Sequence, residues 1–237
     1  NLVYKKAIEY YNKGDYQRAM NLLDGVRSVF VGQAKAQNIA YYRAFCSYNM
    51  KDYQIASDLF KQFIQTYPES SFAEECLYMM GFCDYKASPK PRLDQQVTEK
   101  AIREFQLYLS RYPYSMRKDK VNTYMDEMRD KLSYKAYLSA KNYYLREHYK
   151  AAVISLQNCL KDYPGSKYRE EIMYMLFVSK YQMAVNSVED KKVERYNNAR
   201  EEYYYFADEY PNSRYAADVK KMYEDIEAYL ENYKFED

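Results

Sequence analysis

A tetrapeptide of the form Tyr-Pro-x-Ser occurs four times in this chain, and it constrains the fold more than any other feature. The four copies begin at Tyr67, Tyr112, Tyr163 and Tyr210. Proline has no amide hydrogen and biases the residue before it away from the helical conformation, so each copy predicts the end of a helix. The serine two residues after the proline is a favourable N-cap for a following helix. The repeat therefore predicts a series of helices separated by short turns.

The helix before each turn carries a small residue at a fixed distance from its end. An alanine stands eleven residues before each of the four tyrosines, and also eleven residues before Phe30, where a first repeat should end. These alanines are Ala19, Ala56, Ala101, Ala152 and Ala199. Large apolar or aromatic residues follow each alanine mostly at four and seven residues, which is the spacing of one helix face. We expect each of these helices to pack closely against a partner.

The partner helices have their own register. Ala7, Ala44 and Gly81 recur at intervals of 37 residues, and each has a tyrosine three residues before it and another four residues after it. Two tyrosines seven residues apart lie on one face of a helix. The same tyrosine pair recurs later in the chain. The pairs are Tyr4 and Tyr11, Tyr41 and Tyr48, Tyr78 and Tyr85, Tyr137 and Tyr144, and Tyr174 and Tyr181.

These positions resemble the consensus of the tetratricopeptide (TPR) repeat, over five repeats from about Leu2 to Pro211 with a closing helix from about Ser213 to Tyr233. The chain holds only 5 Gly and 6 Pro, and residues that favour helices outnumber the β-branched ones. A single repeat cannot bury its apolar face, so repeats stack into one continuous core. We expect an all-α, TPR-like α-solenoid of about five helix pairs plus a C-terminal capping helix, without a sheet.

Two repeats depart from the regular period. The segment from Ser88 to Gln96 contains Pro89 and Pro91, which predicts a surface loop between the helices of the third repeat. The fourth repeat contains one helical pattern from Arg117 to Glu147. Both features are additions to the simple TPR pattern.

The composition argues against several classes of function. The 36 basic and 34 acidic side chains leave a net charge of +2, too small to favour nucleic acid as a partner. No segment reaches 18 consecutive apolar residues, and residues 1–11 lack the features of a signal peptide. We expect no membrane-spanning helix.

The residues that carry catalysis and metal binding are sparse. Cys46, Cys76, Cys83 and Cys159 lie in apolar helical patterns without CxxC spacing, which predicts buried free thiols. His148 is the only histidine, and it occupies a turn position that is aspartate in two other repeats. We therefore expect no enzyme, no cofactor and no metal site.

Pairs of adjacent glutamates, such as Glu74–Glu75, Glu170–Glu171 and Glu201–Glu202, face different directions on a helix and predict solvated surfaces.

The tyrosine register remains as the candidate binding surface. In TPR arrays the first helix of each pair lines a concave groove, and tyrosine offers large contact area at little cost in rotamer entropy. Packing between neighbouring helices is the alternative for any single tyrosine. The candidate groove residues are Tyr4, Tyr11, Tyr41, Phe45, Tyr48, Tyr78, Phe82 and Tyr85.

Several segments are similar to the BamD family, the lipoprotein subunit of the outer-membrane β-barrel assembly (BAM) complex. They are Leu77–Tyr85, the loop residues Asp94 and Gln95, Ala101–Ser115 and Lys131–Ser166. The similarity covers nearly the whole chain and includes the inserted loop and the long fourth repeat. It implies a non-enzymatic scaffold on the periplasmic face of the outer membrane, held by an N-terminal lipidated cysteine that we expect in a longer precursor.

The resemblance also implies partners. Residues 1–115 would recognise unfolded outer-membrane protein precursors, and residues 116–237 would dock a BamA-like barrel subunit through a POTRA domain, beside other lipoproteins of the complex. The docking candidates are Lys180 and Tyr181, where better-known members carry an arginine. A periplasmic TPR coordinator of cell-wall synthesis is the alternative, although the chain lacks the sustained heptads of a coiled coil.

Overall fold

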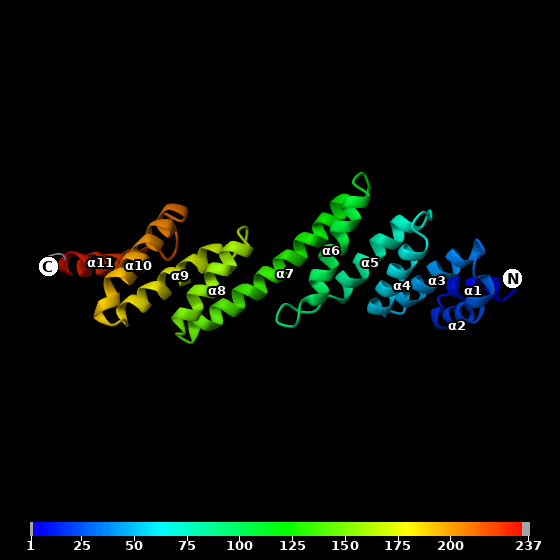
Figure 1. Ribbon diagram of the computed structural model, residues 1–237, viewed down its shortest axis with the longest axis horizontal. Helices are drawn as coiled ribbons and strands as arrows, with labels where there is room; N and C mark the ends of the chain where they lie inside the picture. The colour runs from blue at the N-terminus through cyan, green and yellow to red at the C-terminus, as the bar shows by residue number, and fades with distance from the viewer. Residues whose placement is uncertain (1, 234–237) are drawn as a thin grey trace. The chain divides into compact units, whose positions relative to one another are not determined.

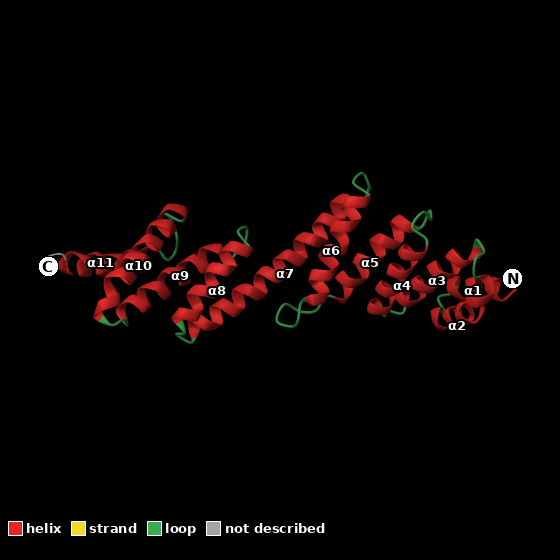
Figure 2. Ribbon diagram, in the orientation of Figure 1, coloured by secondary structure: helices red, strands yellow, loops and turns green. Residues whose placement is uncertain are grey.

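The computed structural model describes residues 2–233, and within this range every regular element is a helix (Figure 2). The α-helices are α1 (Leu2–Asn12), α2 (Tyr16–Val26), α3 (Lys35–Asn49), α4 (Tyr53–Thr66), α5 (Ala73–Ala87), α6 (Gln96–Arg111), α7 (Lys118–Leu145), α8 (Tyr149–Asp162), α9 (Arg169–Val185), α10 (Glu189–Glu209) and α11 (Ala216–Tyr233). A short 3₁₀ helix, η1 (Arg27–Phe30), follows α2. The predicted all-α class is confirmed, and none of these helices is long and apolar enough to cross a membrane.

The helices form two compact units, Asn1–Arg129 and Asp130–Asp237 (Figure 1). In the first unit α1 packs on α2, α3 on α4 and α5 on α6, and each pair contacts the next. In the second unit α8 packs on α9, α9 on α10, and α11 on both α9 and α10. The predicted TPR-like helix pairs and closing helix are therefore present. The long helix of the fourth repeat is α7, and its two ends contribute to different units.

The turns inside the helix pairs share one backbone conformation. Gly14, Lys51 and Glu147 have positive φ angles of 80°, 68° and 59°, a region that favours glycine. The next residue then precedes the second helix, and His148 has a φ of −79° there, matching −80° at Asp52. The structure thus confirms that His148 belongs to a turn.

The turns between the helix pairs differ from the prediction. The next helices begin at Ala73, Lys118, Arg169 and Ala216, each three residues after the serine of the tetrapeptide. Each serine carbonyl accepts a hydrogen bond from that first helical residue, which adds a backbone turn before the helix. The serine Oγ instead accepts the amide hydrogen of the residue two positions on, at 3.0 to 3.3 Å. The predicted N-cap role was therefore wrong.

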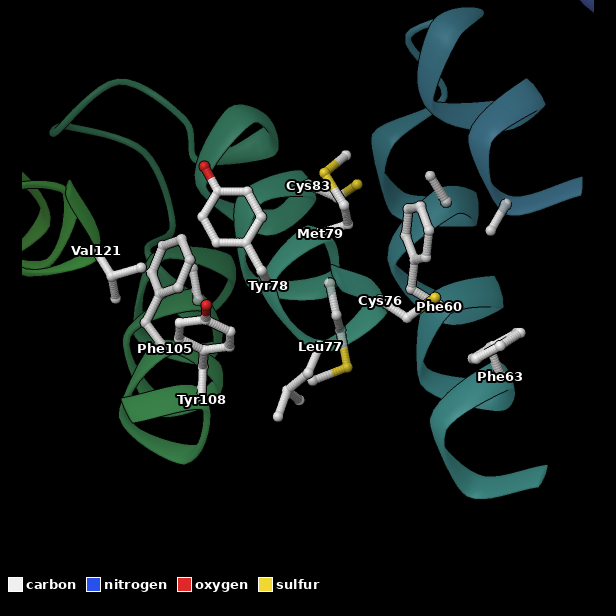
Figure 3. Packing of buried hydrophobic residues seen from close by; sticks show 14 of the residues in the cluster. Phe60, Phe63, Cys76, Leu77, Tyr78, Met79, Cys83, Phe105, Tyr108 and Val121 are labelled. Atoms are coloured by element: carbon white, nitrogen blue, oxygen red, sulfur yellow. The ribbon is translucent and has the colours of Figure 1, made fainter. Parts of the chain in front are cut away.

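The core follows the predicted helix faces. All five alanines of the second helices are fully buried, as are Phe60, Phe63, Phe105 and Tyr108 of the first compact unit (Figure 3). The four cysteines are buried and free, as predicted. Burial raises the pKa of Cys159 to about 11, so that thiol is un-ionised near neutral pH.

Gly81 replaces the alanine of the two earlier repeats for a steric reason. A β-carbon at Gly81 would lie 2.9 Å from Cδ1 of Phe105, which is too close for an ordinary contact. The absence of a side chain therefore lets α5 approach α6.

The inserted loop joins α5 to α6, as predicted. Gln95 is buried at its end and donates hydrogen bonds to the carbonyl oxygens of Lys90 and Leu93, at 2.8 and 3.1 Å. These bonds hold the loop against the start of α6.

Candidate functional site

The first compact unit carries a continuous series of aromatic rings, here called the aromatic ladder. Each ring lies within 4.5 to 6.4 Å of the next between centroids, and every member is half-buried. In order of contact the ladder consists of Tyr11, Tyr42, Tyr41, Phe45, Tyr48, Phe82, Tyr85 and Tyr124. It runs from α1 through α3 and α5 to the start of α7, so the first helices of successive pairs supply it.

Six of the eight predicted groove residues belong to this ladder. Tyr78 is only 7% exposed and stacks beneath Phe82 at 5.7 Å, so it supports the ladder from the core. Tyr4 packs with the N-terminal core cluster around Ala7.

The structure adds Tyr42 and Tyr124 to the predicted set. Tyr42 lies next to Tyr41 in the sequence. Its ring contact with Tyr11 of α1 cannot be read from the 37-residue register. Tyr124 could have been found, because it follows Pro113 by eleven residues, much as Tyr78 and Tyr174 follow Pro68 and Pro164 by ten.

Carboxylates engage the hydroxyl groups of the ladder. Tyr41 donates to Oε2 of Glu75 at 2.7 Å, and Tyr85 donates to Glu127. Burial and then the bond to Glu75 raise the pKa of Tyr41, while the bond to Glu127 is the main cause that raises the pKa of Tyr85 to about 12. These phenols are therefore neutral at physiological pH and act as hydrogen-bond donors.

Cations lie over two rings of the same surface. Nζ of Lys86 is 5.3 Å from the Phe82 centroid, and Nζ of Lys120 is 5.9 Å from the Tyr124 centroid. Such contacts stabilise an exposed aromatic surface by about 0.5–1 kcal/mol each. The surface thus combines exposed ring area with charged groups at its edge.

The prediction that the glutamate pairs form solvated faces was wrong for Glu74, Glu170 and Glu202, which are buried or half-buried, whereas Glu201 is exposed. Oε1 of Glu74 accepts hydrogen bonds from Tyr108 and Ser115, at 3.0 and 2.7 Å. Glu170 accepts from Ser213 at 2.6 Å. The sequence contains a signal for these two hydrogen-bonded positions. Glu74 and Glu170 each follow a proline of the repeat by six residues and therefore face the next turn.

Lys180 and Tyr181, the predicted docking residues, lie on α9 in the second compact unit. Nζ of Lys180 is 2.6 Å from Oε2 of Glu202 on α10, and both side chains are largely buried. Tyr181 donates to Asp225 at 3.2 Å. Lys180 also lines a cavity of about 290 Å³ together with Met183. Within the second unit both residues already bind partners in their own chain.

Among residues 2–233, no three His, Cys, Asp or Glu side chains gather where they could hold a metal ion. The half-buried rings of the ladder combine apolar ring area with polar hydroxyl groups, which carboxylates bind at Tyr41 and Tyr85.

Weak likenesses exist among solved structures. The TPR2AB domain of yeast Sti1, in its pHSP90 complex, is 14% identical with a TM-score of 0.43, over 95% of this chain and 97% of that one. The human IFIT1 dimer with PPP-AAAA is 16% identical with a TM-score of 0.34, over 97% of this chain and 56% of that one. Likenesses this weak say nothing about the partners of this chain.

None of the curated protein sequences matches the chain. A family model does match it, over residues 1–171 and 136–236, which together span nearly all of its length. That model describes an outer membrane lipoprotein. The chain therefore belongs to the YfiO family of outer membrane lipoproteins.

Proposed function

We propose that this protein is a non-enzymatic scaffold of the outer-membrane β-barrel assembly complex, and that its aromatic ladder binds unfolded barrel precursors. The observation that carries the proposal is the unbroken ladder across four helices of the first compact unit. Membership in the YfiO family supports the setting at the outer membrane.

The ladder suits an extended, aromatic segment of an unfolded chain. Aromatic side chains pack in offset or edge-to-face contacts, and each pair contributes about 0.5–1.5 kcal/mol beyond its buried area. The ring planes of the ladder vary, from stacked at Tyr85 and Tyr124 to edge-on at Tyr11 and Tyr42. A surface with varied ring orientations accepts many apolar sequences, as a receptor for diverse precursors must.

The second compact unit would dock a BamA-like barrel subunit through a POTRA domain. Tyr181 supports this proposal because its ring is only half-buried against Tyr196 of α10, and its hydroxyl is 3.2 Å from Asp225. Lys180 would act through the shape of the adjacent cavity more than as a free charge, since Glu202 already binds it. The protein would then work on the periplasmic face of the outer membrane, anchored by a lipid.

A site-specific photocrosslinker tests precursor binding. Placed at Phe82 or Tyr48, it should capture peptides from the terminal strand of a barrel protein, because those rings are half-buried and lie 6.2 Å apart in the ladder. The same crosslinker at Tyr205, which is 66% exposed on α10, is the matched control. Equal capture at all three positions, or none at the ladder, would refute the proposed site.

A binding assay with an isolated POTRA domain tests docking. Tyr181→Ala should weaken the complex, whereas Tyr204→Ala, which removes a tyrosine that is 52% exposed on α10, should leave it unchanged. If both variants bind as the parent does, α9 is not the docking surface.

A further inference from the structure

One of the four Tyr-Pro-x-Ser turns differs from the others at its tip. The turns share their backbone geometry, since each serine amide donates to the tyrosine carbonyl at 3.0 to 3.2 Å. The residue after the proline is Glu69, Gly165 or Asn212 in three turns and Tyr114 in the turn between α6 and α7. The fold of the turn therefore does not require an aromatic residue there.

The same turn has a second apolar substitution. The residue after the serine is Ser71, Lys167 or Arg214 in the other turns and Met116 in this one. Tyr114 is 98% exposed and Met116 is 102% exposed, so neither side chain stabilises the folded unit. Two large apolar side chains, separated by a single residue and in full contact with water, indicate an interaction surface.

The following position changes from aromatic to cationic. In three turns this residue is Phe72, Tyr168 or Tyr215, which packs on a tyrosine of the preceding helix pair at 4.0 to 4.5 Å. In the α6–α7 turn it is Arg117, whose guanidinium lies 4.6 Å from the Tyr78 centroid. An arginine thus replaces a ring directly beside the two exposed apolar side chains.

The sequence around this tip is basic. Residues 111–120 contain Arg111, Arg117, Lys118 and Lys120 against a single acid, Asp119. Arg111, Lys118 and Lys120 are exposed. Fully exposed apolar side chains in a turn between two helices, flanked by exposed cations, match the pattern of segments that bind the interface of an anionic bilayer.

We propose that the α6–α7 turn is a membrane-contact site that inserts Tyr114 and Met116 into the interface of a bilayer containing anionic phospholipid. A bilayer fits better than a protein pocket because both apolar side chains are fully exposed to water, and because the exposed cations beside them complement a surface of negative headgroups. Membership in an outer membrane lipoprotein family supports the presence of a bilayer next to the protein. The site would orient the first compact unit at the membrane, independently of what its ladder binds.

Vesicle flotation of the 237-residue chain tests the proposal. Binding should be stronger to vesicles of phosphatidylcholine mixed with phosphatidylglycerol than to phosphatidylcholine alone. Tyr114→Asn/Met116→Ser introduces the residues that stand at the equivalent positions of two other turns, Asn212 and Ser71. This variant should weaken vesicle binding roughly tenfold or more, because it removes the apolar area that would be buried. Lys118→Gln and Lys120→Gln should each weaken binding to the anionic vesicles about fivefold. Ile55→Gln, at a residue 56% exposed on α4, should have no effect.

Fluorescence locates the contact within the chain. The protein contains no tryptophan, so Tyr114→Trp introduces a single reporter, and Asn212→Trp places one at the equivalent position of the fourth turn. Anionic vesicles should shift the emission of the Tyr114→Trp variant to shorter wavelength and leave the emission of the Asn212→Trp variant unchanged. The proposal is overturned if the wild type binds neither vesicle, if Tyr114→Asn/Met116→Ser floats like the wild type, or if both reporters shift alike.

Discussion

Gly81 is the position where a single methyl group should measure how closely α5 and α6 pack. Gly81→Ala would place a β-carbon 2.9 Å from Cδ1 and 3.0 Å from Cε1 of Phe105, whereas carbon atoms pack best at about 3.5–4.0 Å. Phe105 is fully buried and cannot move freely, because Tyr78 and Tyr124 lie within 6.3 Å of its ring centroid. The surrounding core must therefore shift.

The expected loss follows from two opposing effects. Inserting a methylene-sized group into a well-packed core costs about 1–3 kcal/mol. Replacing a helical glycine by alanine returns roughly 0.5–1 kcal/mol, because the unfolded chain loses freedom. We therefore expect Gly81→Ala to lower the free energy of unfolding by about 1–2 kcal/mol.

Gly25 provides the matched control. It lies in α2, and a β-carbon there would meet no atom within 4 Å, so Gly25→Ala should raise the free energy of unfolding by about 0.5–1 kcal/mol. Urea unfolding followed by circular dichroism would compare the two variants. If Gly81→Ala proves as stable as Gly25→Ala, the close approach of α5 and α6 does not exist in solution. A smaller loss from Phe105→Leu in the Gly81→Ala background than in the wild type would identify Phe105 as the clashing group.

Three further predictions concern buried polar groups. Burial, and then the hydrogen bond with Asp84, raise the pKa of Glu104 to about 8 from its unfolded value near 4.5. The folded protein therefore binds a proton that the unfolded chain releases, and the melting temperature should fall as pH rises from 5 to 8, with a flatter profile for Glu104→Gln. Lys180→Met should lower the free energy of unfolding by about 3–5 kcal/mol, because it leaves the buried Glu202 without its cation. In urea unfolding, Lys180→Met/Glu202→Gln should recover most of this loss, and no recovery would argue against the ion pair. Tyr108→Phe should cost about 1–2 kcal/mol, since its fully buried hydroxyl binds Glu74 and Ser115; equal stability of the variant would contradict that network.

The sequence predicted much of the secondary structure because the relevant signals are local. A proline ends a helix whatever surrounds it, and the 37-residue register fixed which tyrosines share a helix face. The buried alanines, the free cysteines and the turn at His148 were predicted for the same reason. The helix start after each serine was misplaced, because an additional backbone turn depends on how the chain enters the next helix.

The candidate site was predicted in outline only. The register identified Tyr41, Phe45, Tyr48, Phe82 and Tyr85 as neighbours on successive helices, and the structure brings their rings together. It could not separate these half-buried rings from a buried one such as Tyr78. That difference depends on which side chains the adjacent helix pair presents.

The repeat, the order of the helix pairs and the unusual composition of the α6–α7 turn can all be read from the amino-acid sequence alone. The partners of the charged and aromatic side chains, in contrast, depend on how the helices pack. Glu75 accepts from Tyr41 across 34 residues, and Lys180 binds Glu202 across 22 residues. Contacts of this kind depend on the rotation and spacing of helices that pack against one another, and no local pattern of residues specifies those quantities.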